Sequence, residues 1–193
     1  MDIILGTASK LRIRAMESLG IPFQVVVSNF DEEQTKVDDV KDLVIATAKG
    51  KAAVLAQQYP NAIVITLDSN NFFEGKKYGK PASREQAKEW LMTMAGKSQE
   101  FYTALVLTHQ ASGKQTVDLN ISKIIFKSFS EKELNNYLNQ IDPTTMAIGW
   151  SPEGPGINLL ERFEGEPGVE MALPLDTLKK RLIEFTGNKV LNT

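Results

Sequence analysis

Residues 3–12, Ile-Ile-Leu-Gly-Thr-Ala-Ser-Lys-Leu-Arg, combine a short apolar run, a turn of small residues and the start of a helix. The apolar run 3–5 predicts a buried strand that ends at Gly6. Ser9 is a favourable N-cap for a helix over residues 10–19. The first elements expected in this chain are therefore a buried strand and the helix that follows it.

The rest of the chain also mixes strand and helix patterns. We expect helices over 38–58, 83–96, 130–139 and 173–185, strands over 23–27, 62–65, 101–107, 116–126 and 159–163, and a hairpin around Glu74-Gly75. The two long strands that meet around Ser112-Gly113 are antiparallel, so the sheet should be mixed. The length favours a single α/β domain spanning residues 1–193.

Composition narrows the possible functions. The net charge is −2, which gives no overall attraction to nucleic acid or to an anionic membrane. The chain has no cysteine, which excludes disulfides, thiolate metal sites and a cysteine nucleophile. Its only histidine, His109, argues against histidine triads and zinc sites. No signal peptide or membrane span is expected, so we expect a cytoplasmic protein.

The segment from Gly6 to Arg12 is the first candidate site. Free N–H groups and the helix dipole at a helix start attract anions. Thr7 and Ser9 add hydroxyl donors, and Arg12 can grip a phosphate with two parallel hydrogen bonds. The alternative is a capped helix with a surface arginine. The glycine and lysine spacing excludes a Walker loop.

Asp68 is the second candidate, because it follows the apolar run 62–65. A carboxylate at the end of a central strand commonly holds a metal ion or a catalytic water. The alternative is a turn-forming aspartate before Ser69-Asn70-Asn71.

Lys80 is the third candidate, because it lies between Gly79 and Pro81, where the backbone has little freedom. Such a lysine is a well-placed point charge for a phosphate, or else an ordinary loop lysine. Glu32, in an acidic loop, and Lys49 carry little information on their own. Lys49 lies off the centre of a mostly apolar helical stripe formed by Val40, Leu43, Val44, Thr47, Ala48, Lys51 and Leu55.

These segments occur in an order that resembles the Maf family of nucleoside triphosphate pyrophosphatases, over nearly the whole chain. The matching segments are Thr7-Ala8-Ser9-Lys10-Leu11-Arg12, Leu19-Gly20-Ile21-Pro22-Phe23, Asp31-Glu32, Ala46-Thr47-Ala48-Lys49, Thr66-Leu67-Asp68-Ser69, Gly79-Lys80-Pro81, Ala95 to Ala104, Glu161 to Gly165 and Leu173-Pro174-Leu175. The resemblance implies an elongated mixed-sheet α/β fold of the inosine triphosphate pyrophosphatase-like superfamily, with two lobes around a central cleft.

The resemblance also implies an activity, namely cleavage of a nucleoside triphosphate to the monophosphate and pyrophosphate with Mg²⁺ or Mn²⁺. Catalytic roles would fall to Asp68, Lys80 and Lys49, and metal binding to Glu32 and Asp68. Thr7, Ser9, Arg12 and Glu153 would bind the substrate. The family further suggests a homodimer, while the nucleotide base stays open.

Several positions depart from the family pattern. Leu11 replaces the first arginine of an arginine pair, and Glu153 replaces a glutamine, a shift of about −2 in a pocket for a polyanion. Glu166 and Val169 stand where the family has serine and asparagine, Gln99 where it has histidine and Trp150 where it has tyrosine. An active enzyme of altered specificity is one interpretation. The others are a binding or regulatory module without catalysis, and a metal-dependent hydrolase of dinucleotides or sugar nucleotides.

Overall fold

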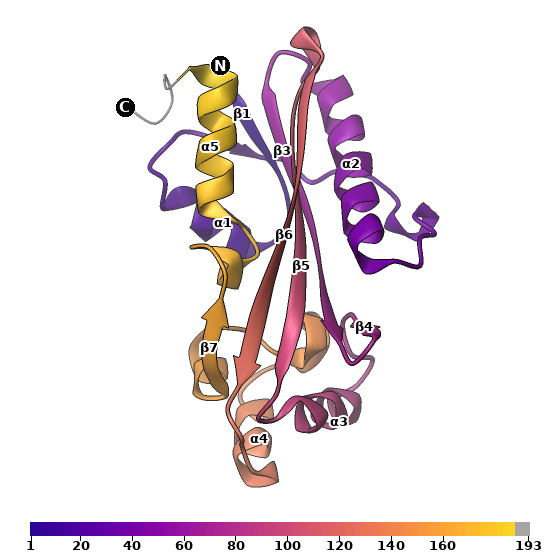
Figure 1. Ribbon diagram of the computed structural model, residues 1–193, viewed down its shortest axis with the longest axis vertical. Helices are drawn as coiled ribbons and strands as arrows, with labels where there is room; N and C mark the ends of the chain where they lie inside the picture. The colour runs from indigo at the N-terminus through magenta and orange to yellow at the C-terminus, as the bar shows by residue number, and fades with distance from the viewer. Residues whose placement is uncertain (188–193) are drawn as a thin grey trace. The chain divides into compact units, whose positions relative to one another are not determined.

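The computed structural model describes residues 1–187 and contains a mixed sheet with helices packed against it (Figure 1). Among these residues the sheet has seven strands, with β2, β1, β3, β5, β6 and β7 as successive neighbours and β4 paired to β3. The strands are β1 Ile3–Gly6, β2 Gln24–Val25, β3 Ile63–Phe73, β4 Lys76–Tyr78, β5 Ser98–His109, β6 Lys114–Phe126 and β7 Leu160–Glu164. The helices are α1 Lys10–Glu17, α2 Val40–Gln58, α3 Arg84–Met94, α4 Glu131–Leu138 and α5 Leu175–Thr186.

Strand pairing confirms the expected mixed sheet. β1 is parallel to both β2 and β3, whereas β3 pairs antiparallel with β4, and β6 with β7. The hairpin between β3 and β4 turns at Glu74 and Gly75, whose φ angles are 48° and 79°. Positive φ at both central residues gives the turn a twist that matches the flanking strands.

Three strand predictions were wrong in length, and one of them is β5, which was expected over 101–107 but spans Ser98–His109. β3 was expected over residues 62–65 but continues to Phe73, so Asp68 lies inside the strand and not after it. The polar Ser69-Asn70-Asn71 segment suggested a turn, but Ser69 instead contacts Thr103 of β5, with 3.0 Å between the two hydroxyl oxygens. The strand expected over 23–27 is only Gln24–Val25.

The described chain divides into two compact units. The first contains Met1–Ser69, Thr103–Asn120 and the residues from Glu166 onward, and the second contains Asn70–Tyr102 and Ile121–Gly165. The second unit has a hydrophobic core of its own, built from β3, β6, β7, α3 and α4. Its largest members include Phe73, Leu91, Phe126, Tyr137 and Trp150.

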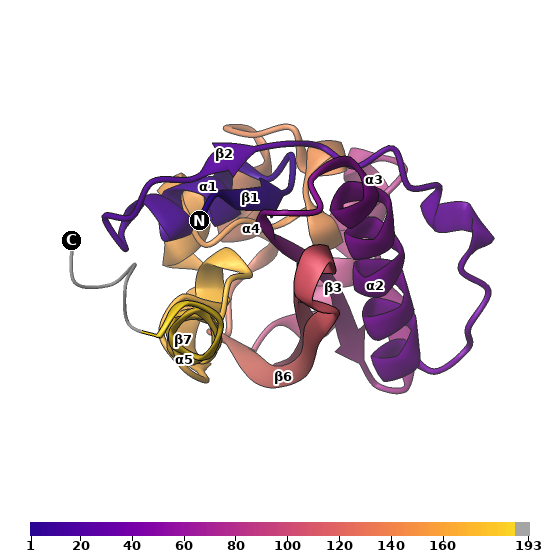
Figure 2. The same ribbon diagram turned by 90° about the horizontal axis from the view of Figure 1, so that it is seen from above.

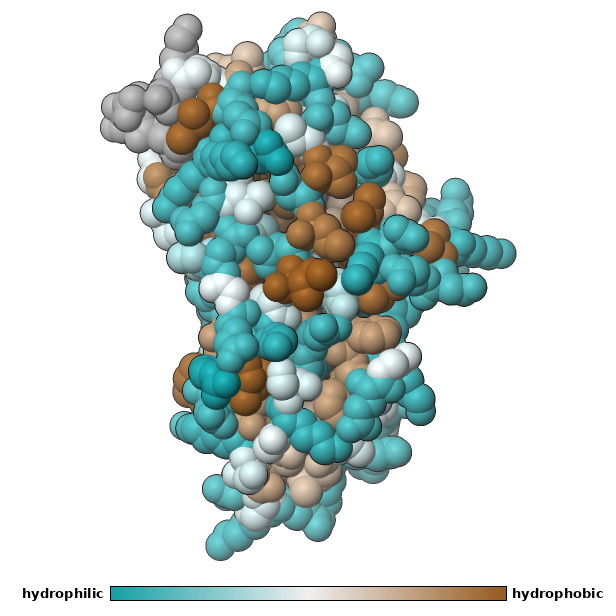
Figure 3. Space-filling view, viewed as in Figure 1, coloured by the Kyte–Doolittle hydropathy of each residue, from teal (hydrophilic) through white to brown (hydrophobic). Residues whose placement is uncertain are grey.

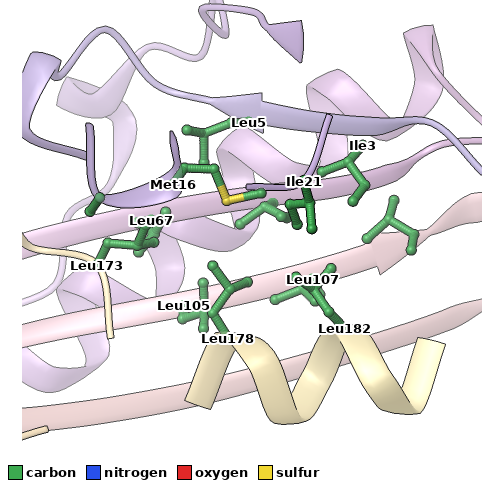
Figure 4. Close-up of a cluster of buried hydrophobic side chains, with 13 residues drawn as sticks. Ile3, Leu5, Met16, Ile21, Leu67, Leu105, Leu107, Leu173, Leu178 and Leu182 are labelled. Carbon is green, nitrogen blue, oxygen red and sulfur yellow. The ribbon is translucent and has the colours of Figure 1, made fainter. Parts of the chain in front are cut away.

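Both faces of β1 and β3 are buried in the first unit, by α2 on one side and by α1 and α5 on the other (Figure 2). Ile3, Leu5 and Leu67 pack with Met16, Leu178 and Leu182 (Figure 4). Ile4 and Val64 alternate with them and pack on the other face against Leu55 of α2. Strands covered on both faces show continuous apolar runs, as the sequence does here.

The surface is predominantly polar. Hydrophilic residues cover most of the face drawn in Figure 3, with hydrophobic residues in small groups among them. Within the part of the chain that the structure describes, no helix is long and apolar enough to cross a membrane.

Glu166 stabilises the start of α5 from outside the helix. The N-cap position of α5 is Pro174, which supplies no side-chain cap. The Glu166 carboxylate instead accepts hydrogen bonds from the Thr177 backbone N–H and hydroxyl, both at 2.7 Å, and from Asn120 Nδ2 at 2.6 Å. A carboxylate at a helix N-terminus satisfies open N–H groups and interacts favourably with the helix dipole.

We therefore predict that Glu166→Ala lowers the free energy of unfolding by about 1–2 kcal/mol, the usual cost of losing a helix cap. Chemical denaturation followed by circular dichroism measures the change. Glu161→Ala is the control, because Glu161 makes an exposed ion pair with Arg162 and its replacement should change stability by less than about 1 kcal/mol. Equal effects of the two substitutions would contradict a capping role for Glu166.

Candidate active site

The centre of the candidate site is the Asp68 carboxylate on β3. Its side chain is 14% exposed, and Lys51 of α2 donates to its Oδ1 at 3.1 Å. The same Lys51 Nζ lies 2.8 Å from Oε1 of Glu32. One ammonium group therefore joins two carboxylates that lie 36 residues apart in the chain.

Two contacts to α2 determine where Lys51 and Glu32 lie. Thr66 on β3 donates its hydroxyl to the Ala48 carbonyl of α2 at 2.8 Å, which ties the helix to the strand one turn before Lys51. Phe30, near Glu32, packs directly against Gly50, where a Cβ atom would lie 2.2 Å from the ring carbon Cζ. Glu32 itself begins the short 3-10 helix Glu32–Gln34, which Asp31 caps.

Arg12 approaches β3 from the other side, where β1 has ended. The last paired residues of β1 and β3 are Gly6 and Thr66, so the edge of β3 is open beyond them. Arg12 Nη1 donates to the Leu67 carbonyl at 3.3 Å, Nη2 to Ser69 Oγ at 2.8 Å and Nε to the Ala172 carbonyl at 3.1 Å. Three of its N–H groups are thus held by the protein, which fixes the direction of the guanidinium.

Burial and charge act against each other in this cluster. Burial raises the pKa of the Asp68 carboxyl above its ordinary value, while Lys51 and Arg12 act to lower it. Burial also lowers the pKa of the Arg12 guanidinium, and Asp68 and Glu32 act to raise it. For both Asp68 and Arg12, burial disfavours the ionised form, and the opposite charges nearby favour it.

The turn before α1 has the predicted capped form. Ser9 Oγ accepts from the Arg12 N–H at 3.5 Å, and Thr7 Oγ1 accepts from the Ser9 N–H at 3.1 Å. Thr7 is buried, so its hydroxyl serves the turn. Ser9 and Thr7 thereby place the first turn of α1 so that Arg12 faces β3.

Lys49, expected from the family motif to be catalytic, is exposed, and Lys51 makes the contacts to Asp68 and Glu32. The reason is helix geometry, because residues two positions apart point about 200° apart around the axis. A signal for Lys51 was present in the sequence, since Lys51 is the one charged residue in the apolar stripe of α2. A lysine at such a position needs a buried partner.

Lys80 and Glu153 belong to the second unit, and both are exposed. Lys80 lies between Gly79, whose carbonyl accepts from the Ile148 N–H at 2.7 Å, and the buried Pro81. The Glu153 backbone N–H donates to Ser151 Oγ at 3.3 Å. The roles of both residues toward a substrate stay predictions.

Comparison with known proteins identifies the family. The family model described as Maf-like protein matches residues 2–185. The chain belongs to the Maf family. A relative from Neisseria meningitidis serogroup A, called 7-methyl-GTP pyrophosphatase, is 30% identical over 98% of this chain and 95% of its own length. A protein of the same name from Neisseria gonorrhoeae is 29% identical with the same coverage.

A solved structure is also similar to this Maf-like protein. It is a HAM1 protein from Coxiella burnetii, with a TM-score of 0.49 and 13% identity over 95% of this chain and 99% of that one. The family expected from the sequence motifs is thus confirmed by the family model, and the mixed α/β fold by the structure itself.

Lys51→Met should destabilise this Maf-like protein in a pH-dependent way. Without the ammonium, one of the influences that lower the pKa of Asp68 is lost, so that pKa rises further. A carboxyl with a raised pKa in the folded state destabilises the fold progressively as pH rises from its ordinary value to the folded value. We expect a loss of about 1–3 kcal/mol at pH 7 and a smaller loss at pH 4.

Urea unfolding in EDTA at both pH values measures this effect. Lys49→Met is the matched control, since it removes an exposed lysine of the same helix, and it should change stability by less than about 0.5 kcal/mol at either pH. If Lys51→Met costs the same at pH 4 and pH 7, its effect does not act through the Asp68 carboxylate.

Proposed function

We propose that this protein hydrolyses a nucleoside triphosphate to the nucleoside monophosphate and pyrophosphate. The observation that carries the proposal is the Asp68 carboxylate, held between Lys51 and Arg12 in a chain of the Maf family. The named relatives from Neisseria are called 7-methyl-GTP pyrophosphatases, which supports this reaction class. 7-Methyl-GTP is accordingly the first nucleotide to test.

In the proposed reaction, Asp68 acts as the general base. A water molecule attacks the α-phosphorus, and its proton passes to the Asp68 carboxylate. The bond between the α-phosphorus and the oxygen that bridges to the β-phosphorus breaks, and pyrophosphate leaves. Burial suits Asp68 to this role, because a raised pKa makes a carboxylate a stronger base.

The basic residues would stabilise the negative charge on the phosphates. Arg12 would donate to phosphate oxygens, and protein acceptors fix the direction of the guanidinium. Lys51 lies directly beside Asp68, so it would contact the reacting centre. The resemblance to the family assigns a further phosphate charge to Lys80, and that role stays a prediction. Ser9 and Thr7 support this arrangement through the turn that aims Arg12.

Glu32 and Asp68 are the residues that would hold a divalent metal. Their oxygens suit Mg²⁺ or Mn²⁺, and Mg²⁺ is usually bound by one or two carboxylates together with substrate phosphates. Across residues 1–187, no group of three or more carboxylate, histidine or cysteine side chains is arranged to hold a metal. The donor set therefore fits a metal that shares its ligands with the nucleotide. Such an ion would neutralise phosphate charge.

A pyrophosphate-release screen tests the proposal. It covers 7-methyl-GTP, the canonical ribo- and deoxynucleoside triphosphates and modified nucleotides, each with Mg²⁺, Mn²⁺ or Co²⁺. Turnover of one nucleotide supports the proposed pyrophosphatase activity. Binding without turnover would favour a regulatory module that has kept the fold, and neither binding nor turnover would contradict both. Light scattering of the same samples measures whether the predicted homodimer forms.

Asp68→Asn should preserve the fold and lower kcat by about 10²–10⁴-fold, the usual contribution of a general base. The amide is nearly the same size as the carboxylate but accepts a proton poorly. Initial rates on the substrate found in the screen measure the loss, and circular dichroism checks folding. The control is Asp38→Asn, an exposed carboxylate in the same unit. Near wild-type rates for Asp68→Asn would show that another group accepts the proton.

If Glu153 has the substrate-binding position that the family resemblance implies, Glu153→Gln should tighten binding of a non-hydrolysable triphosphate by about three- to tenfold without Mg²⁺, because it removes a negative charge from a site for a polyanion. Two prolines stiffen the loop around Glu153, so the side chain cannot easily swing away. Titration calorimetry with and without Mg²⁺ measures the effect, and Glu161→Gln is the exposed control. If Glu153→Gln weakens triphosphate binding only in the samples that contain Mg²⁺, Glu153 is a metal ligand. If the affinity is unchanged with and without Mg²⁺, Glu153 lies in solvent.

A further inference from the structure

The Lys51 ammonium occupies the position between Glu32 and Asp68 where a bridging cation would be expected. Its Nζ lies 2.8 Å from Glu32 Oε1 and 3.1 Å from Asp68 Oδ1, so one nitrogen makes close ionic contacts with both carboxylates. The Lys51 and Asp68 side chains are only 12% and 14% exposed, which limits competition from water for this contact. Each carboxylate therefore already has one oxygen committed to a positive charge.

The charges of this cluster also balance without a metal. Glu32 and Asp68 contribute two negative charges, and Lys51 and Arg12 contribute two positive charges. Arg12 is close enough for both carboxylates to influence its pKa. A divalent ion added to this neutral group would meet two cations and no excess negative charge, which is electrostatically unfavourable.

We propose that Lys51 excludes divalent metal from the Glu32 and Asp68 pair until a nucleotide binds, so that metal and nucleotide bind cooperatively. The inference rests on the proposed function, because it takes a polyphosphate as the ligand that changes the balance. Triphosphate oxygens offer the ammonium other acceptors and bring negative charge. The long, flexible stem of a lysine lets its ammonium move to them. The carboxylate oxygens that Lys51 releases then become ligands for a metal that the phosphates also bind.

Metal binding can be measured without turnover. Mn²⁺ is titrated into the wild-type protein and followed by electron paramagnetic resonance, which distinguishes free from bound ion. We expect the wild type alone to bind Mn²⁺ weakly, and Lys51→Met to bind it about tenfold or more tightly because the carboxylate pair is then open. Lys51→Arg keeps the positive charge and should bind as weakly as the wild type. Lys51→Met combined with Asp68→Asn should lose the gain.

The second arm uses the wild-type protein only, so it does not depend on how a variant folds. An α,β-methylene analogue of the nucleotide is added. We expect the mixture of protein and analogue to bind more Mn²⁺ than the sum of the amounts that protein and analogue bind in separate samples. By linkage, Mn²⁺ should increase the affinity for the analogue by the same factor. Circular dichroism verifies that Lys51→Met is folded before its titration is interpreted.

Two results would overturn the inference. One is tight binding of Mn²⁺ to the nucleotide-free wild type with the same affinity as to folded Lys51→Met. The other is an analogue that binds with an affinity independent of Mn²⁺. Failure of the proposed function gives a different pattern, in which no nucleotide analogue binds at all while the contrast between wild type and Lys51→Met in nucleotide-free samples is kept.

Discussion

The ion pair between Asp68 and Lys51 is the interaction on which the candidate site depends. Asp68 follows five strand residues that are buried on both faces and is itself only 14% exposed, and a carboxylate in such a place requires a close positive charge. Lys51 supplies that charge only if α2 has the correct rotation against β3. The Thr66 hydroxyl bond to the Ala48 carbonyl maintains this rotation. Packing of a helix on a sheet thus determines the electrostatics of the site.

The length of β1 is the complementary constraint. Because β1 stops at Gly6 while β3 continues to Phe73, the edge of β3 beside Asp68 has carbonyl groups without a strand partner on that side. Arg12 binds there through Leu67 and Ser69. A short strand followed at once by a helix therefore brings a guanidinium to the buried carboxylate. The guanidinium proposed to bind phosphate and the carboxylate proposed as the general base are positioned by one local feature of the sheet.

The sequence predicts this arrangement in part. Arg12 lies in the first turn of α1, shortly after the apolar run of β1, and Asp68 follows the apolar run 62–65 within β3. Both positions can be recognised from local patterns. The partner of Asp68 could not be recognised in this way. The signal lay instead in the helix period, because Lys51 belongs to the apolar stripe of α2 that meets β3, whereas the family motif selects Lys49, which lies off the centre of that stripe. The true length of β3 could not be predicted from local residues, because pairing with β5 overrides the turn preference of Ser69-Asn70-Asn71.

The contact between Gly50 and Phe30 has an evolutionary consequence. Gly50 carries no charge itself, yet any side chain there would displace the Phe30 ring and with it the segment that carries Glu32. Natural selection would therefore favour glycine at position 50 because the position must have no side chain. A lineage could lose catalysis by drift at this glycine while every charged residue of the site stayed intact, and a comparison restricted to catalytic residues would still classify such a descendant as an enzyme.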